Sequence, residues 1–241
     1  MTAEFILQEL LSVANPEKAK FLQGFFKTGK GQYAEGDVFL GIVVPITRNI
    51  VKENKAFPLS EIQILLDSEY HEARLAGLLF LAQQFKKTKK EEERKEIFDF
   101  YLANARKANN WDLVDVTCRD VIGLYLLDKE DRSVLYRLAE SDNLWEQRIA
   151  IVSTWMFIKH KQYDDTLALS EKLLNHKHDL MHKAVGWMLR EVGKKDRETL
   201  VNFLDKHYKK MPRTALRYAI EHFPNKQRAY YMKYDISQRL S

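Results

Sequence analysis

The stretch WEQRIAIVSTW, residues 145–155, decides the fold because related segments recur along the chain. The others are HEARLAGLLFL (71–81), NNWDLVDVTCR (109–119), LMHKAVGWMLR (180–190) and MPRTALRYAIE (211–221). Superposing Arg74, Trp111, Arg148, Lys183 and Thr214 gives steps of 37, 37, 35 and 31 residues. A period near 35 residues, with two helices in each unit, is typical of α-solenoids built from HEAT-like helix pairs.

The hydrophobic pattern between these segments is also helical. Apolar residues recur at spacings of three and four, as in Leu7, Leu10 and Leu11. With 9 Gly and 5 Pro in 241 residues, the chain has few of the residues that turns require, which argues against an all-β sandwich or barrel. We therefore predict an all-α fold, a single solenoid domain over residues 1–241 with about a dozen helices, in which only residues 28–38 form a substantial loop.

Composition and cysteine content exclude several classes of protein. The chain is 45% hydrophobic and 30% charged, as expected for a folded, soluble protein. Its one cysteine, Cys118, permits no intramolecular disulfide, CxxC pair or cysteine-rich zinc site, which favours a reducing, cytoplasmic location. Residues 1–11 lack a basic region and contain Glu4 and Glu9, and the longest apolar runs reach about eight residues. Secretion and membrane insertion are not expected.

The charge of the chain is compatible with a polyanionic partner. The net charge is +5 and the isoelectric point is near 9.0. Basic residues outnumber acidic ones toward the C-terminus and alternate with tyrosines, which suits a surface that follows a nucleic-acid backbone; a solvated helix face is the alternative. These basic residues are Lys206, Lys209, Lys210, Arg213, Arg217, Lys226 and Arg228. The segment KKTKKEEERK (86–95) mixes both signs, and we interpret it as solvated surface.

The repeat register places several chemically distinctive residues at equivalent positions. Residues four apart share a helix face, so Trp111 and Asp115 are neighbours. One repeat later Arg148 takes the position of Trp111, and the next repeat contributes Lys183, Trp187 and Arg190 to the same stripe. The concave side of a solenoid would bring Trp111, Asp115, Arg148 and Trp187 to one extended ligand.

A carboxylate between two tryptophans and an arginine suits a reaction that develops positive charge. The carboxylate stabilises a cation, indole faces attract it, and arginine binds phosphate. The alternative is structural, because tryptophans often anchor cores and Asp–Arg pairs often bridge repeats.

Other motifs indicate no further chemistry. The array His176, His178 and His182 lacks the cysteine or acidic pair that would complete a metal site, and we predict no metal. TGKG at 28–31 lacks the spacing and the preceding strand of a P-loop, and there is no GxSxG elbow. Cys118 lies in an apolar helix and is expected to be a buried structural thiol.

The chain resembles the HEAT-like-repeat DNA alkylation repair glycosylases, the AlkD family. The resemblance covers nearly the whole chain. The matching pieces, in the order and spacing of the family, are NPEKA (15–19), FLGIVVP (39–45), NNWDLVD (109–115), SDNLWEQRIAI (141–151) and KAVGWMLRE (183–191). Together these pieces are specific, whereas each alone is weak.

This resemblance implies a function and roles for individual residues. Family members excise cationic N3- and N7-alkylated purines, such as 3-methyladenine and 7-methylguanine, from double-stranded DNA without flipping the base into a pocket. Asp115 would be the catalytic carboxylate, with Trp111 and Trp187 against the deoxyribose and Arg148 on a backbone phosphate. Lys183, Arg190, Arg213 and Arg217 are further candidate DNA contacts. A monofunctional, monomeric enzyme that needs no cofactor is expected, and it would leave an abasic site.

Two other functions remain open. A non-catalytic module that binds branched or damaged DNA would show salt-dependent binding without base release. A protein-interaction scaffold would not bind duplex DNA at moderate salt. In addition, the sequence assigns no role to residues 28–36 or to Phe25, Phe26 and Tyr33 near the N-terminus.

Overall fold

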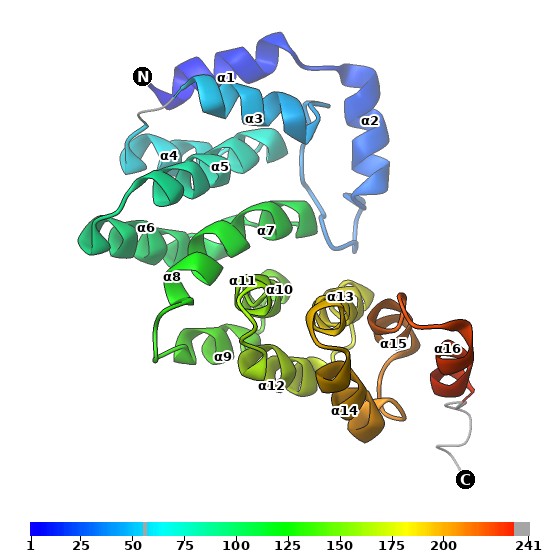
Figure 1. The fold of residues 1–241 in the computed structure, drawn as a ribbon. Helices are drawn as coiled ribbons and strands as arrows, with labels where there is room; N and C mark the ends of the chain where they lie inside the picture. The colour runs from blue at the N-terminus through cyan, green and yellow to red at the C-terminus, as the bar shows by residue number, and fades with distance from the viewer. Residues whose placement is uncertain (55–56, 234–241) are drawn as a thin grey trace. The chain divides into compact units, whose positions relative to one another are not determined.

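The computed structural model describes residues 1–54 and 57–233, and within these ranges the regular structure is helical (Figure 1). The nearest approach to a sheet there is an isolated parallel bridge between Val38 and Tyr70. The predicted all-α fold class is therefore confirmed.

The chain forms two compact units, Met1–Tyr125 and Leu126–Ser241. The prediction of a single domain remains a prediction. The first unit contains α1 (Ala3–Ser12), α2 (Pro16–Phe25), α3 (Val44–Glu53), α4 (Leu59–Leu66), α5 (His71–Lys87), α6 (Glu91–Ala103), η1 (Ala105–Lys107), α7 (Trp111–Cys118) and η2 (Arg119–Gly123); α8 (Leu124–Leu126) runs across the division. The second contains α9 (Ser133–Ala139), α10 (Leu144–Ser153), α11 (Trp155–Lys159), α12 (Asp164–Leu173), α13 (Asp179–Lys195), α14 (Arg197–His207), α15 (Arg213–Ala219) and α16 (Asn225–Met232).

Each of the five related sequence segments covers the N-terminal part of a helix. These helices are α5, α7, α10, α13 and α15, and each follows a helix that completes a pair. Within the second unit, α13 packs against both α10 and α15, and the backbones of α13 and α15 approach closely. A Cβ on Gly186 would lie 2.5 Å from the carbonyl oxygen of Ala215, so only glycine fits there. This arrangement is that of a helical-repeat protein.

Local sequence explains where several helices begin. Asn15 caps α2 by accepting a hydrogen bond from the Lys18 amide at 2.9 Å, and Pro16 follows at the first helical position. Asn143 caps α10 in the same way, accepting from the amides of Trp145 and Glu146.

Two features of the helix pattern were not predicted from the sequence. A break at residues 67–70 separates α4 from α5, although DSEY contains no glycine or proline to mark it. The turn is instead stabilised by Arg74, whose guanidinium donates to the carbonyls of Ser68 and Glu69 at 2.8 and 2.9 Å. The chain then passes from α7 through η2, a π-helical turn, into α8; π-turns inside helices often occur at functional sites.

The core of the first unit is centred on α5. Residues 71–82 are all buried, including Leu75, Leu78 and Phe80. Helices α3, α4, α6 and α7 pack around it, so that α5 fixes the position of α7. Across the described residues, every helix is too short or too polar to cross a lipid bilayer.

Candidate functional site

Trp111 and Asp115 lie on α7, where the predicted spacing places them one turn apart. Asn110 caps this helix, and its side-chain oxygen accepts a hydrogen bond from the Trp111 amide at 2.8 Å. Trp111 and Asp115 are both half-buried, whereas Leu113 and Val114, which lie between them in the sequence, are buried. The helix thus keeps an indole and a carboxylate accessible on a packed support.

An aromatic stack supports Trp111 from behind. Its ring lies 5.2 Å from Phe26 at 26°, and Phe26 stacks on Phe39 at 4.9 Å. Phe39 in turn stacks on the imidazole of His71 at 4.2 Å. Such contacts hold the indole face at a defined angle.

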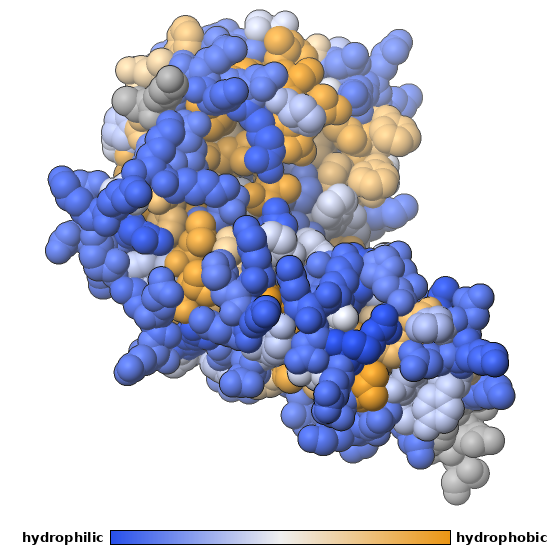
Figure 2. All heavy atoms as spheres, in the orientation of Figure 1, coloured by the Kyte–Doolittle hydropathy of each residue, from blue (hydrophilic) through white to orange (hydrophobic). Residues whose placement is uncertain are grey.

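Exposed aromatic rings on α2 extend this stack, and together they form an aromatic wall beside Trp111. Phe25 meets Trp111 edge to face at 6.2 Å and stacks on Phe21 at 6.3 Å. Phe25 is 54% exposed and Phe21 is 68% exposed, an unusual condition for two neighbouring phenylalanines. Hydrophobic side chains reach the surface of the first unit where α2 runs (Figure 2). Sequence reasoning left Phe25 and Phe26 unassigned, and the structure places both against Trp111.

The segment before α3 is held by one buried carboxylate. Glu72 accepts hydrogen bonds from the backbone amides of Leu40, Gly41 and Ile42, at 2.9, 2.9 and 3.0 Å. Its exposure is 1%, so these three donors replace the water that the carboxylate loses. Glu72 of α5 therefore holds the backbone of the motif FLGIVVP (39–45) in place.

A buried ionic cluster lies next to this segment. His71 Nδ1 is 2.8 Å from Asp37 and its Nε2 is 2.9 Å from Asp112, while Arg74 also bonds to Asp37. Burial alone would lower the pKa of His71, but the hydrogen bonds to Asp112 and Asp37 outweigh it and raise that pKa to about 9. The pKa of Asp37 is lowered, because His71 and Arg74 overcome the opposing effect of its own burial.

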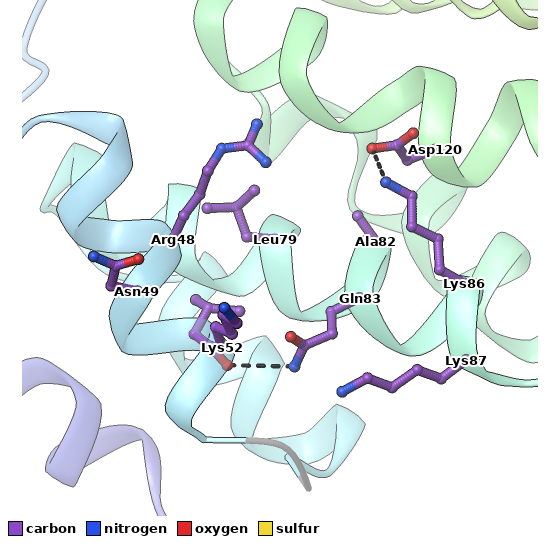
Figure 3. A pocket seen from close by; sticks show the side chains of 10 residues that line it. Arg48, Asn49, Lys52, Leu79, Ala82, Gln83, Lys86, Lys87 and Asp120 are labelled. Atoms are coloured by element: carbon purple, nitrogen blue, oxygen red, sulfur yellow. Dashed lines mark hydrogen bonds and ion pairs between the residues drawn. The ribbon is translucent and has the colours of Figure 1, made fainter.

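A basic cleft of about 390 Å³ lies elsewhere on the first unit, between α3, α5 and η2 (Figure 3). Arg48, Lys52 and Lys87 line it and make no ion pair with any residue that the structure describes, whereas Lys86 pairs with Asp120 at 2.6 Å. The interpretation of 86–95 as solvated surface fits the exposed pair of Lys90 and Glu93. That interpretation did not foresee that Lys86 and Lys87, at the start of this segment, lie beside α3 and line a positively charged cleft with it.

In the second unit the remaining candidates lie on three helices that pack in sequence: Arg148 on α10, Lys183, Trp187 and Arg190 on α13, and Arg213 and Arg217 on α15. Trp187 is half-buried. Arg148 is only 5% exposed and donates to the carbonyl of Leu180 at 2.6 Å, near the start of α13. The role of Arg148 as a phosphate ligand therefore stays a prediction, to which the structure adds a contact that joins α10 to α13.

The other cationic candidates differ in how they are held. Lys183 pairs with Asp179 at 2.9 Å, and Arg190 pairs with Glu221 and approaches Glu191. Arg213 donates to the carbonyl of Met232 at 2.8 Å. Arg217 is exposed, with a long 3.5 Å contact to Thr214. Of these four, Arg217 is the most accessible to a ligand.

The histidines of the array His176, His178 and His182 form hydrogen bonds within the protein. His176 Nε2 bonds to Gln147 at 2.8 Å, and the His182 ring bonds to the carbonyl of His176. Burial lowers the pKa of both His176 and His178. Among the described residues, no group of histidine, cysteine or acidic side chains is arranged to hold a metal ion.

A profile of the DNA alkylation repair enzyme family matches residues 6–223. The chain belongs to this family. The match includes every candidate residue on α7, α10, α13 and α15.

A solved structure shares the fold of this family member. It is described as a predicted DNA alkylation repair enzyme from Enterococcus faecalis, and it aligns with a TM-score of 0.67 over 88% of this chain and 97% of its own. The two sequences are 19% identical, so the likeness concerns the fold. No curated protein matches this sequence.

Proposed function

We propose that this member of the DNA alkylation repair enzyme family is a monofunctional glycosylase. Its substrate is a cationic N3- or N7-alkylated purine in double-stranded DNA, and it hydrolyses the N-glycosidic bond without flipping the base. The observation that carries the proposal is the pair formed by Asp115 and Trp111, accessible on one face of α7 within a chain of this family.

The chemistry requires stabilisation of a sugar cation. An alkylated purine already carries a positive charge, so the bond between C1′ and nitrogen breaks with its electron pair moving to the base, which leaves neutral. The deoxyribose then acquires oxocarbenium character, and the carboxylate of Asp115 stabilises it. Water adds to C1′ and loses a proton to solvent, giving an abasic site.

The aromatic wall suits this reaction. The face of Trp111 adds cation–π stabilisation of roughly 0.5 to 2 kcal/mol, and it limits water near Asp115. The stack of Phe26 and Phe39 behind Trp111 fixes its angle before substrate arrives. For Trp187 and Arg148 we retain the roles that the family resemblance implies, contact with the deoxyribose and with a backbone phosphate.

The basic cleft supports DNA as the ligand of the first unit. Arg48, Lys52 and Lys87 present three positive charges that no described carboxylate neutralises. Phosphate contacts of this kind supply affinity and orientation without reading the base sequence.

The decisive experiment measures base release from N-methylated duplex DNA with excess enzyme. We expect Asp115→Asn to release 7-methylguanine or 3-methyladenine at least 10² to 10³-fold more slowly than the wild type, because the electrostatic stabilisation is lost. Its affinity for duplex DNA should remain within a few fold of the wild-type value. Asp164→Asn, on the exposed first turn of α12, is the matched control and should behave as the wild type.

The other outcomes identify the alternatives. Duplex binding without base release by the wild type would identify a non-catalytic DNA-binding module. Absence of duplex binding at moderate salt would favour a protein-interaction scaffold. Equal excision rates for Asp115→Asn and the wild type would refute the mechanism.

A further inference from the structure

The buried cluster of Asp37, His71 and Asp112 has no part in the chemistry described above, yet it lies directly behind the proposed site. His71 is 2% exposed and comes from the first residue of α5. Asp37 comes from the loop that precedes α3, and Asp112 is the second residue of α7. The imidazole therefore joins three segments that are distant in sequence.

The geometry requires both ring nitrogens to donate. Nδ1 and Nε2 each face a carboxylate oxygen, at 2.8 and 2.9 Å. A neutral imidazole has one donor and one acceptor nitrogen, so one carboxylate would face a lone pair. The imidazolium satisfies both contacts, and a salt bridge from Arg74 supplies the second positive charge of the cluster.

The cluster reaches Trp111 by two routes. Through the backbone, Asp112 follows Trp111 directly, and its second oxygen accepts from the Leu113 amide at 2.9 Å, so the carboxylate fixes the first turn of α7. Through the rings, the His71 imidazole lies 4.2 Å from the ring of Phe39 and 5.5 Å from that of Phe26, and Phe26 stacks on the indole of Trp111. Arg74 adds a contact to Asn109 at 3.3 Å, just before the helix.

We propose that His71 is a positioning residue for excision: as an imidazolium bridging Asp37 and Asp112, it sets the orientation of Trp111 and the start of the helix that carries Asp115. This inference rests on the proposed glycosylase function. His71 touches neither DNA nor the reacting atoms. The charged groups facing it are Asp37 from the loop and Asp112 from α7, with Arg74 of its own helix on the far side of Asp37.

The first test separates positioning from binding. In His71→Gln the amide can donate to one carboxylate only, and its oxygen faces the other. We expect the single-turnover rate of base release to fall by about 10-fold or more, with duplex affinity within a few fold of wild type. His160→Gln, an exposed histidine of the second unit whose ring bonds to the carbonyl of Met156, is the matched control and should leave the rate unchanged.

The conservative variant is Asp112→Asn. Its amide can donate to Nε2 of a neutral His71 while Nδ1 donates to Asp37, so the bridge is retained without the charge. Near neutral pH, Asp112→Asn should therefore keep most of the wild-type single-turnover rate of base release, unlike His71→Gln. The wild-type rate should fall as pH rises through about 9, where His71 loses its proton, whereas Asp112→Asn should lack this decline.

A spectroscopic readout does not depend on activity. With 5-fluorotryptophan incorporated, the fluorine resonance of Trp111, assigned with Trp111→Phe, should shift or broaden in His71→Gln and stay near its wild-type position in Asp112→Asn. A wild-type protein without base release would refute the glycosylase function, while this signal would still test the positioning. Wild-type excision by His71→Gln together with an unmoved Trp111 resonance would overturn the inference.

Discussion

At the scale of single residues, Gly41 shows why the segment before α3 tolerates little change. Its φ of +83° lies in the left-handed region, and a Cβ would be 2.1 Å from the carbonyl oxygen of Asn15. That carbonyl oxygen accepts a hydrogen bond from the backbone amide of Ala19 in the first turn of α2. The backbone amide of Asn15 in turn donates to the carbonyl oxygen of Leu40 at 2.8 Å. Backbone therefore packs against backbone at the N-terminus of α2.

Gly41→Ala should lower the free energy of unfolding by several kcal/mol, since steric overlap adds to the cost of a positive φ. Gly36→Ala is a close control: its φ is +79°, but no atom lies within 4 Å of the added Cβ, and we expect a loss of about 1 kcal/mol. Urea unfolding of both variants measures the difference. Equal losses would show that the contact with Asn15 relaxes at no cost.

At the scale of helices, α3 and α5 together create a charged surface that neither carries alone. Arg48 and Lys52 are one turn apart on α3, and Lys86 and Lys87 end α5. Only the packing of the two helices brings these side chains to one cleft (Figure 3).

The double variant Arg48→Ala with Lys52→Ala should weaken duplex binding uniformly across DNA sequences. If each side chain displaces one counterion from the DNA, the slope of log affinity against log salt should fall by about 2. Lys95→Gln on α6, whose ammonium pairs with Asp99, is the control and should leave the slope nearly unchanged. Titration of labelled duplex at several salt concentrations gives the slope. An unaltered slope in the double variant would exclude this cleft from the DNA interface.

Helix periodicity and spacing predicted much of what these elements show. They indicated the five related helices and the placement of Trp111 and Asp115 on one face, because a helix relates residues three and four apart. The break at 67–70 was missed because its turn depends on the later Arg74 rather than on a local turn residue. The bridge through His71 was missed for a similar reason, since it joins positions 37, 71 and 112, which no local pattern relates.

At the scale of the whole molecule, the buried cluster makes stability depend on pH. The pKa of His71 in the folded protein, about 9, exceeds its ordinary value of 6.5, so the folded state binds a proton that the unfolded state releases more easily. The raised pKa of His71 contributes roughly 3 kcal/mol to the free energy of unfolding. This contribution is complete below pH 6.5 and is lost as pH rises through about 9. On the acid side, the lowered pKa of Asp37 means that its contribution is lost as pH falls below the ordinary value of 3.8.

Urea midpoints of the wild type should therefore decline between pH 6.5 and pH 9.5. His71→Gln should be less stable at pH 6.5 and show a flatter profile over this range, whereas His160→Gln should follow the wild type. Parallel profiles for His71→Gln and the wild type would mean that another group titrates.

The loop at residues 28–36 closes on itself. The Ala34 amide donates to the carbonyl of Lys27, the Gly36 amide donates to that of Thr28, and the Gly31 amide donates to the side chain of Glu35. Its ends are thus tied together, while Glu72 separately anchors the chain that follows. Because a Cβ on Gly31 would meet no atom within 4 Å, we expect a reporter peptide inserted beside Gly31 to leave the backbone of residues 40–42, which Glu72 holds, in place.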